Sequence, residues 1–403
     1  MKHGFTLAPT LGMSSRPPGL IRYSAQRFGQ MAAWDAAIVI PAKDEQARLH
    51  ACLDAAAVAI HAASDLTAGI VLVVNNTTDE SAHRAFEWAL DRGVVPFVLI
   101  DCAFAPAEAG AGAARRLGLD TACDHLAAPG VLLTTDADTL VRDDWVIRNL
   151  AELRVAELIC GTVLGRADEA RALPPAIAAH GSIEQDYLTA SIELVARLDP
   201  QPHDPAPAHH NAAGASMAVS RRVYEMVGGL PPLPMSEDRA FAERVDAHDF
   251  RIRYSAAAIV ETSCRMTGRT AGGMAGTLRA RATQQDPWAD QWMEAAHALA
   301  WRHGLRGRLR AGWPDAPALH GTLCAVLGQR HADRITAGPP GPYFGAFFAA
   351  LEHSTPRLVR DRLRLSDCHR ELPKLRALLA TKKPARDRYP AQSALGGNTC
   401  AAV

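Results

Sequence analysis

Short apolar runs alternate with longer mixed segments through the first third of the 403-residue chain. Each run holds five or six residues, mainly Val, Ile, Leu and Ala, which is typical of a strand buried on both faces. The segments between them are rich in Ala and Leu, or carry acids first and Arg-Gly last, and so favour helices. We therefore predict strands at residues 36–40, 69–74, 95–100 and 130–135, and helices at residues 45–63, 79–93 and 108–123. This alternation predicts a doubly wound, mixed but mostly parallel α/β sheet with helices on both faces.

The pattern becomes less regular in the second half of the chain. We expect strand character at residues 212–220 and 251–262, and helices at residues 180–198, 221–229, 236–248 and in much of the chain beyond 280. A loop rich in Pro and His, residues 199–210, separates the helix expected at 180–198 from the strand expected at 212–220. The chain is thus predicted to have four parts: an irregular leader (1–34), an α/β domain (35–275), a helical C-terminal extension (276–385) and a flexible tail (386–403).

Charge and cysteine content narrow the range of functions. The 43 Lys and Arg residues balance the 43 Asp and Glu residues, so the net charge is zero and a nucleic acid is not an expected partner. The eight cysteines form no Cys-x-x-Cys pair, which excludes a zinc ribbon or a thioredoxin-like dithiol and fits a reducing compartment. No apolar stretch is long enough to predict a transmembrane helix, and no secretory signal is recognisable. We therefore expect a cytoplasmic protein.

Polar clusters follow three of the predicted strands. They are residues 41–45, residues 75–79, and the pair Asp136 and Asp138. Ligands of open parallel sheets bind beyond the carboxyl ends of the strands, so these clusters mark a candidate site. Neither a Gly-x-Gly-x-x-Gly nor a P-loop motif follows the first strand, which argues against a dinucleotide dehydrogenase and a P-loop NTPase.

Two acid pairs carry candidate chemistry. Asp136 and Asp138 flank one small residue at a strand end, where both carboxylates can converge on one ion. Hard oxygen ligands suit Mg²⁺ or Mn²⁺, although two solvated loop acids would give the same pattern. Glu237 and Asp238 begin a predicted helix. Either one is a general base for an acceptor hydroxyl, or both simply complement the helix dipole.

Two further clusters each allow two interpretations. The loop histidines could help to hold a metal ion or could belong to a mobile surface loop; they are His203, His209 and His210. A run of arginines predicts either a solvated helix face or a surface that contacts an anionic membrane or a phosphorylated acceptor; it comprises Arg302, Arg306, Arg308 and Arg310.

Taken in order, seven segments of the chain resemble the family 2 glycosyltransferases of the GT-A fold. The resemblance covers about residues 36 to 270, and the remaining C-terminal residues carry no motif that we recognise. The segments are VIPAKDE, VVNNTTDES, GAARRLG, TTDADT, GASMAVSRRVYEMVGGL, SEDRAFAERV and RIRYSAAAIVETSCR.

The resemblance implies roles for individual residues. On the donor side, residues that line the nucleotide base and ribose or approach the nucleotide sugar would be Pro41, Ala42, Lys43, Glu45, Asn76, Asp79 and Arg115. Asp136 and Asp138 would bind Mg²⁺ or Mn²⁺ and, through it, the diphosphate, which Arg265 could also approach. Glu237 and Asp238 would be the acceptor-side acids, with Asp238 as the base.

Two departures from the family pattern shape the predicted function. Asn75-Asn76-Thr77-Thr78 stands where the family commonly has Asp-Asp-Gly-Ser, which leaves the donor base open. The Gln-x-x-Arg-Trp signature of processive synthases is absent. We therefore expect a metal-dependent, inverting, non-processive enzyme that moves one sugar from a nucleotide-diphosphate sugar to a hydroxyl of a small molecule, lipid-linked acceptor or glycan.

Three alternatives remain at this stage. A retaining GT-A enzyme would use a histidine as an extra metal ligand. A non-catalytic scaffold that binds nucleotide sugars would keep the fold without the chemistry. A nucleotidyltransferase is disfavoured, because the segment after the first strand has one Lys and no Gly.

Overall fold

The computed structural model describes residues 17–29, 31, 33–92, 95–268 and 273–381. The chain divides into two compact units. The first unit contains residues up to 171 together with 211–245 and 250–277, and the second contains 172–210, 246–249 and the residues from 278 onward. Residues 1–16 of the predicted leader, residues 382–385 of the predicted extension and the whole predicted tail (386–403) lie outside the described residues.

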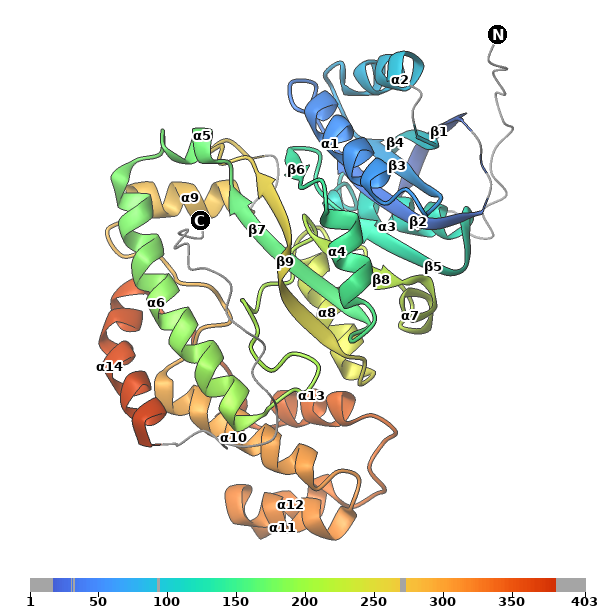
Figure 1. Cartoon of the computed structure of the whole chain (residues 1–403). Coiled ribbons are helices and arrows are strands. Elements are labelled where there is room, and N and C mark those ends of the chain that lie inside the picture. The colour runs from blue at the N-terminus through green and yellow to red at the C-terminus, as the bar shows by residue number, and fades with distance from the viewer. Residues whose placement is uncertain (1–16, 30, 32, 93–94, 269–272, 382–403) are drawn as a thin grey trace. The chain divides into compact units, whose positions relative to one another are not determined.

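The first unit is built on a nine-stranded mixed sheet with the strand order β1-β4-β3-β2-β5-β8-β7-β9-β6 (Figure 1). β2 pairs in parallel with both β3 and β5, β3 pairs in parallel with β4, and β7 pairs in parallel with β9. The remaining pairs are antiparallel. The strands are β1 (Leu20–Phe28), β2 (Trp34–Ala42), β3 (Ala68–Asn75), β4 (Phe97–Phe104), β5 (Leu126–Thr134), β6 (Thr139–Val141), β7 (Leu158–Gly165), β8 (Met217–Ser220) and β9 (Ile252–Thr262).

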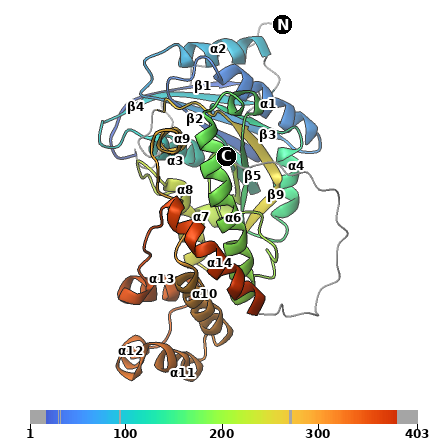
Figure 2. The ribbon, with the colours of Figure 1, turned by 90° about the vertical axis from the view of Figure 1, so that its left-hand side faces the viewer.

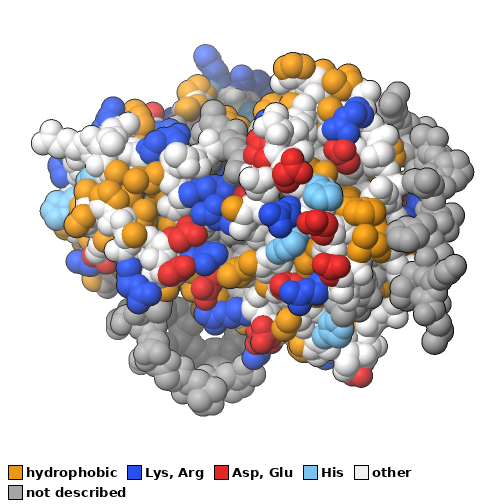
Figure 3. All heavy atoms as spheres, turned by 90° about the horizontal axis from the view of Figure 1, so that it is seen from above, with side chains coloured by type: hydrophobic (Ala, Val, Ile, Leu, Met, Phe, Trp, Pro, Cys, Tyr) orange, Lys and Arg blue, Asp and Glu red, His pale blue; other side chains and the backbone are white. Residues whose placement is uncertain are grey.

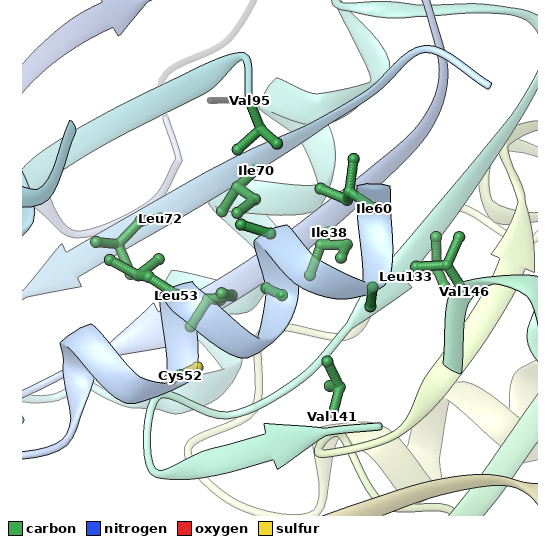
Figure 4. Close-up of a cluster of buried hydrophobic side chains, with 14 of the residues drawn as sticks. Ile38, Cys52, Leu53, Ile60, Ile70, Leu72, Val95, Leu133, Val141 and Val146 are labelled. Atoms are coloured by element: carbon green, nitrogen blue, oxygen red, sulfur yellow. The ribbon is translucent and has the colours of Figure 1, made fainter. Parts of the chain in front are cut away.

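Helices cover both faces of this sheet. α1 (Leu49–Ala62), α2 (Ser81–Arg92) and α4 (Trp145–Glu152) pack on one face, and α3 (Ala111–Cys123), α7 (Arg221–Met226) and α8 (Glu237–Ala247) pack on the other. The short α5 (Ala167–Ala170) follows β7. Alternate residues of one strand serve the two cores, because successive side chains point to opposite faces. Ile38 lies in the cluster with Leu53 and Ile70 (Figure 4), whereas Val39 lies in the other cluster.

The structure confirms the predicted fold class and corrects several details of the elements. Residues 20–28 are not an irregular leader but the edge strand β1, which pairs antiparallel with β4. Its sequence, LIRYSAQRF, lacks a buried apolar run, and the strand is ordered by its ladder with β4. Strands β6 and β7 and helix α4 were not predicted, and the strand expected at residues 212–220 covers only Met217–Ser220.

The second unit is helical. α6, α10 and α14 pack together (Figure 2) around buried side chains such as Tyr187, Leu299 and Leu375. A second cluster joins α10, α11 and α13 through Leu309, Leu323 and Phe348, among others. The helices of this unit are α6 (Pro175–Leu198), α9 (Met274–Thr283), which begins in the first unit, α10 (Ala296–Ala311), α11 (Ala316–Leu327), α12 (Gln329–Ile335), α13 (Phe344–Ser354) and α14 (Leu365–Thr381), with the 3-10 turn Pro356–Leu358.

Two observations concern the surface and the helices. On the face seen in Figure 3, Lys and Arg side chains are interspersed with Asp and Glu side chains, as the zero net charge leads one to expect. No helix among the described residues has the length and apolar content that crossing a bilayer requires.

Candidate active site

Carboxylates and arginines of the first unit gather where the parallel strands β2 and β5 end. Glu45 follows β2, and Asp136 and Asp138 follow β5. The first turn of α8 and the chain after β9 complete the group with Glu237, Asp238 and Arg265. The group thus lies beyond the carboxyl ends of the strands, which is where ligands of open α/β sheets bind.

Arg115 on α3 is the buried centre of one half of this group. Its guanidinium donates to Asp136 Oδ1 at 2.8 Å and to Glu237 Oε1 at 3.3 Å. It also donates to Thr134 Oγ1 at 2.6 Å and to the Gly214 carbonyl at 2.9 Å. Burial lowers the pKa of Arg115, but the two carboxylates outweigh this effect and hold it above the ordinary value, so the group stays charged. Every nitrogen of this guanidinium therefore contacts the protein, and Arg115 fixes both acids.

Gly214 is required next to this guanidinium. A Cβ atom built on Gly214 would lie 2.5 Å from Arg115 Cζ, closer than atoms can approach. The same residue links the arginine to the second acid of α8, because its N–H donates to Asp238 Oδ2 at 2.9 Å. The Gly214 peptide thus connects the group around Arg115 with Asp238.

Arg265 organises the other half of the group. It forms a two-pronged ion pair with Glu45, with N···O distances of 2.7 and 2.5 Å, and lies 2.9 Å from Asp138 Oδ2. All three side chains are largely buried. Such planar, bidentate contacts to carboxylates are characteristic of arginine. Arg265 therefore ties the end of β2 to the acid pair after β5.

The group carries more negative than positive charge. Five carboxylates (Glu45, Asp136, Asp138, Glu237 and Asp238) surround two guanidinium groups (Arg115 and Arg265). Burial, and then the neighbouring charge of Asp136, raise the pKa of Asp138 to about 6. Burial also raises the pKa of Glu237, against the opposing effect of Arg115. A cation bound here would lower the cost of keeping these acids ionised.

Asp136 and Asp138 fit a divalent cation. They supply hard carboxylate oxygens, and the Asp136 side chain is still 37% exposed although it contacts Arg115. The described part of the chain holds no cluster of three or more His, Cys, Asp or Glu side chains arranged for a metal ion. Mg²⁺ commonly takes ligands from substrate phosphates in addition to one or two protein carboxylates, and two carboxylates are what this edge of the sheet offers.

The loops after β2 and β3 are locked together by their own polar groups. Asp44 accepts hydrogen bonds from Thr77 Oγ1 and from the Thr78 N–H and hydroxyl. Asp79 accepts hydrogen bonds from the Ser81 N–H and hydroxyl at the start of α2, and from the Gln46 N–H. Asp79 thus stabilises a helix start and a loop contact, and its carboxylate is already engaged in the structure.

Asn76 is also engaged by the protein. Its amide donates to the Phe104 carbonyl at 2.8 Å and accepts from the Phe104 N–H at 2.9 Å. Its backbone φ of 49° lies in the left-handed region, which Asn tolerates better than most residues. The position that the resemblance assigns to base contact therefore holds the end of β4 in this structure.

The three remaining donor-side residues differ in access. Pro41 and Ala42 are buried in the last positions of β2, where they pair with Val73 and Val74 of β3. Lys43 comes directly after the strand and is partly exposed. Of these three, Lys43 is the side chain that reaches solvent at this edge.

The loop histidines and the run of arginines, for which the sequence allows two interpretations each, both lie in the second unit. His210 lies 3.5 Å from Asp290 and packs on the Trp292 ring. The predicted solvated arginine face is not what the structure shows. Arg302, Arg306 and Arg310 form ion pairs with buried or half-buried acids, and Arg308 alone of the four is exposed.

Sequence reasoning included Asp44 in the cluster at residues 41–45, but it missed Thr134 and Gly214 as parts of this site. Thr134 and Gly214 act on Arg115, and Asp44 acts on the β3 loop. The predicted residues that the structure brings together are Glu45, Arg115, Asp136, Asp138, Glu237, Asp238 and Arg265. The signal available in the sequence was the single glycine of Ala-Ala-Gly-Ala, Gly214, because such a glycine can mark a place where another group approaches the backbone closely.

Comparisons with known proteins find distant similarities only. No family model and no curated protein matches the chain. Among solved structures it is similar to a mannosyltransferase from Pyrobaculum calidifontis in complex with GDP-Man and Mn²⁺, with 15% identity, 87% of each chain covered and a TM-score of 0.42. It is similar to S. aureus TarS 1–349 in complex with UDP-GlcNAc, with 13% identity, 80% of this chain and 92% of that chain covered and a TM-score of 0.41. It is also similar to glucosyl-3-phosphoglycerate synthase from Mycobacterium tuberculosis in complex with Mn²⁺, UDP and phosphoglyceric acid, with 17% identity, 62% of this chain and 77% of that chain covered and a TM-score of 0.38.

Proposed function

We propose that this chain is a glycosyltransferase that moves one sugar from a nucleotide-diphosphate sugar to an acceptor hydroxyl. The observation that supports this most directly is the group of five carboxylates and two arginines beyond the carboxyl ends of β2 and β5. A diphosphate leaving group requires a cation, and a hydroxyl nucleophile requires a base. The family resemblance of the motifs that carry these residues supports the same assignment.

Asp136 and Asp138 are the proposed ligands of Mg²⁺ or Mn²⁺. Bound there, the ion supplies Lewis-acid neutralisation of the charge that develops on the diphosphate. Arg115 holds Asp136 and Arg265 holds Asp138, so that both carboxylates keep one orientation before the ion binds. This assigns Arg115 to positioning rather than to a direct contact with the nucleotide.

Asp238 is the proposed general base. Its carboxylate is held by the Gly214 N–H and by the Arg239 N–H, and the side chain is only half-buried. Glu237 beside it is buried against Arg115, which leaves Asp238 as the acid with access to an acceptor. If Asp238 takes the hydroxyl proton while the oxygen attacks the anomeric carbon directly, the product has inverted configuration. A retaining product would contradict this single-displacement mechanism.

The donor pocket is proposed to use residues 41–45 and the neighbouring loop of β3. Because Asn76 and Asp79 are engaged by the protein, we assign them to shaping that loop, and Lys43 is the side chain proposed to reach the nucleotide. The base and the sugar of the donor remain to be measured. A hydroxyl acceptor, cytoplasmic location and peripheral contact with a membrane likewise stay predictions from the sequence.

A thermal-shift panel tests the donor and metal assignments. Wild type is melted with UDP, GDP, ADP, dTDP or CDP, each with and without Mn²⁺. A ligand that binds only the folded state raises stability by about 2.7 kcal/mol at a hundred times its dissociation constant. We expect a metal-dependent shift with one nucleotide that is lost in Asp138→Ala and kept in Asp143→Ala, which removes an exposed acid of the same unit. No shift with any nucleotide would contradict the proposal.

Asp238→Asn tests the chemistry separately from binding. We expect the nucleotide shift to remain and turnover to fall by about 10² to 10⁴, the usual contribution of a general base. Turnover is measured as nucleoside diphosphate release from sugar donors that carry the nucleotide identified by the panel, with Asp143→Asn as the matched control. Nucleotide binding without any turnover in wild type would instead favour the non-catalytic scaffold.

A further inference from the structure

The second unit contains a cluster of a thiol, an imidazole and a carboxylate. Cys324 and His320 lie one turn apart on α11, and Asp333 lies on α12. The Cys324 Sγ lies against the His320 ring, 3.5 Å from Nδ1 and 3.6 Å from Nε2, and His320 Nε2 is 2.9 Å from Asp333 Oδ1. Gln329 joins the group, because its Oε1 accepts a hydrogen bond from the Cys324 thiol at 3.3 Å and its Nε2 donates to Asp333 Oδ1 at 2.9 Å.

The three side chains have complementary chemical roles. With a proton on Nε2, His320 donates to Asp333, and this leaves Nδ1 unprotonated at 3.5 Å from the Cys324 Sγ, close enough to take the proton that the thiol shares with Gln329. A nucleophile, a base within reach and an acid that orients the base form the arrangement that activates thiols. The hydrogen bond from His320 also lowers the pKa of the Asp333 carboxyl, which therefore stays ionised as the orienting group.

Cys324 also differs from the other cysteines in access. Among the seven cysteines that the structure describes, six are buried and Cys324 is partly exposed. Burial raises the pKa of the Cys102 and Cys368 thiols to about 12, so that they stay protonated near neutral pH. Within the described chain, Cys324 is thus the cysteine that combines access to solvent with an adjacent base.

We propose that Cys324 is a thiol–disulfide exchange site for low-molecular-weight disulfides such as oxidised glutathione. His320 Nδ1 takes the Sγ proton, and the thiolate attacks one sulfur of the external disulfide. A new S–S bond to Cys324 forms as the original S–S bond breaks, and the departing thiolate takes the proton back from His320. Cys324 is oxidised and the leaving half of the disulfide is reduced, so the step needs no further oxidant. This inference does not depend on the proposed transferase activity.

The same contacts could serve only to tether α11 to α12, and reactivity separates the two roles. The full chain carrying Cys400→Ser is incubated with oxidised glutathione, because Cys400 lies outside the described residues. Intact-mass spectrometry gives the rate, and peptide mapping gives the site. We expect one adduct, located at Cys324 and absent in Cys324→Ser.

The base and its orienting group are tested by rate. We expect His320→Gln to slow adduct formation at pH 7.5 at least about tenfold, as the loss of a general base does. His331→Gln, on the exposed face of α12, is the matched control and should leave the rate unchanged. Asp333 is 56% exposed, so Asp333→Asn keeps the fold and should slow the rate several-fold. An adduct at another cysteine, or equal rates in wild type, His320→Gln and Asp333→Asn, would overturn the proposal in favour of a tether.

Discussion

The two units both surround arginines with carboxylates, but they balance the charges differently. In the second unit three arginines form ion pairs with four acids. The group comprises Arg302, Arg306, Arg310, Asp199, Asp246, Glu294 and Glu352. Two of the acids, Asp199 and Glu294, are almost fully buried. In the first unit two arginines meet five acids, and Asp136 remains open to solvent. Near-balanced, buried groups hold helices together, whereas an excess of carboxylates with access to solvent is suited to receive a cation.

The largest expected effect is the loss of the buried network in the second unit. Arg302→Met leaves Glu294 without its partner, and a buried charge left unpaired costs about 3–5 kcal/mol of unfolding free energy. Guanidinium denaturation gives the total change, and hydrogen exchange should show lost protection along α10. Arg308→Met, on the exposed face of the same helix, is the control and should stay within about 0.5 kcal/mol. Equal effects of the two variants would contradict the contrast drawn between the units.

A smaller loss is expected from Arg115→Met in the first unit. The variant leaves Glu237 buried without its partner, but Asp136 can turn to solvent and Glu237 can bind a proton. We therefore expect the free energy of unfolding to fall by about 2–3 kcal/mol. The metal-dependent nucleotide shift should disappear as well, because both acids lose their common anchor. Arg148→Met, which breaks an exposed pair on α4, should leave stability almost unchanged. A destabilised Arg115→Met protein with an unchanged nucleotide shift would refute the positioning role.

The smallest effect has the opposite sign. The pKa of Asp138 is about 6 in the fold, above the ordinary carboxyl value of 3.8, so ionising it opposes folding at all pH values above about 6. Asp138→Asn should therefore stabilise the metal-free protein at pH 7.5 by about 1–2 kcal/mol. Below pH 3.8 both states bind the proton, and the gain should vanish.

Denaturation in EDTA at pH 7.5 and at pH 3.5 measures this difference. Asp143→Asn, an exposed acid, is the control and should show little change at either pH. If Asp138→Asn is destabilising at pH 7.5, the ion pair with Arg265 outweighs the repulsion from Asp136, and the first unit would resemble the second in its charge balance.

Much of the sheet could be predicted because its strands carry their own signal. β3 is buried at every position, and β2 almost so, which gives the continuous apolar runs that were recognised. β1 carries no such run, and its order depends on pairing with β4, some eighty residues further on. Local composition cannot reveal a strand whose stability comes mainly from a distant ladder.

The candidate site shows the same division. The sequence predicts metal ligands and a general base at four acids, because they follow a strand or begin a helix; they are Asp136, Asp138, Glu237 and Asp238. The partners of Arg115 were not predicted: Glu237 lies 122 residues away along the chain, and Gly214 lies 99 residues away. Asn76 was assigned to base contact by its motif, whereas its amide pairs with the Phe104 backbone.

By itself the sequence determined the alternation of strands and helices and the acids at their ends, because hydrophobic period and end signals are local properties of the chain. The fold sets which charged side chains form ion pairs and which stay accessible to solvent. A solvated face was one interpretation of the arginines of α10, but the fold pairs three of them with acids, buries Arg302 and leaves Arg308 exposed. Burial and charge pairing depend on neighbours that only the fold brings together, and these neighbours set the ionisation and the accessibility of each group.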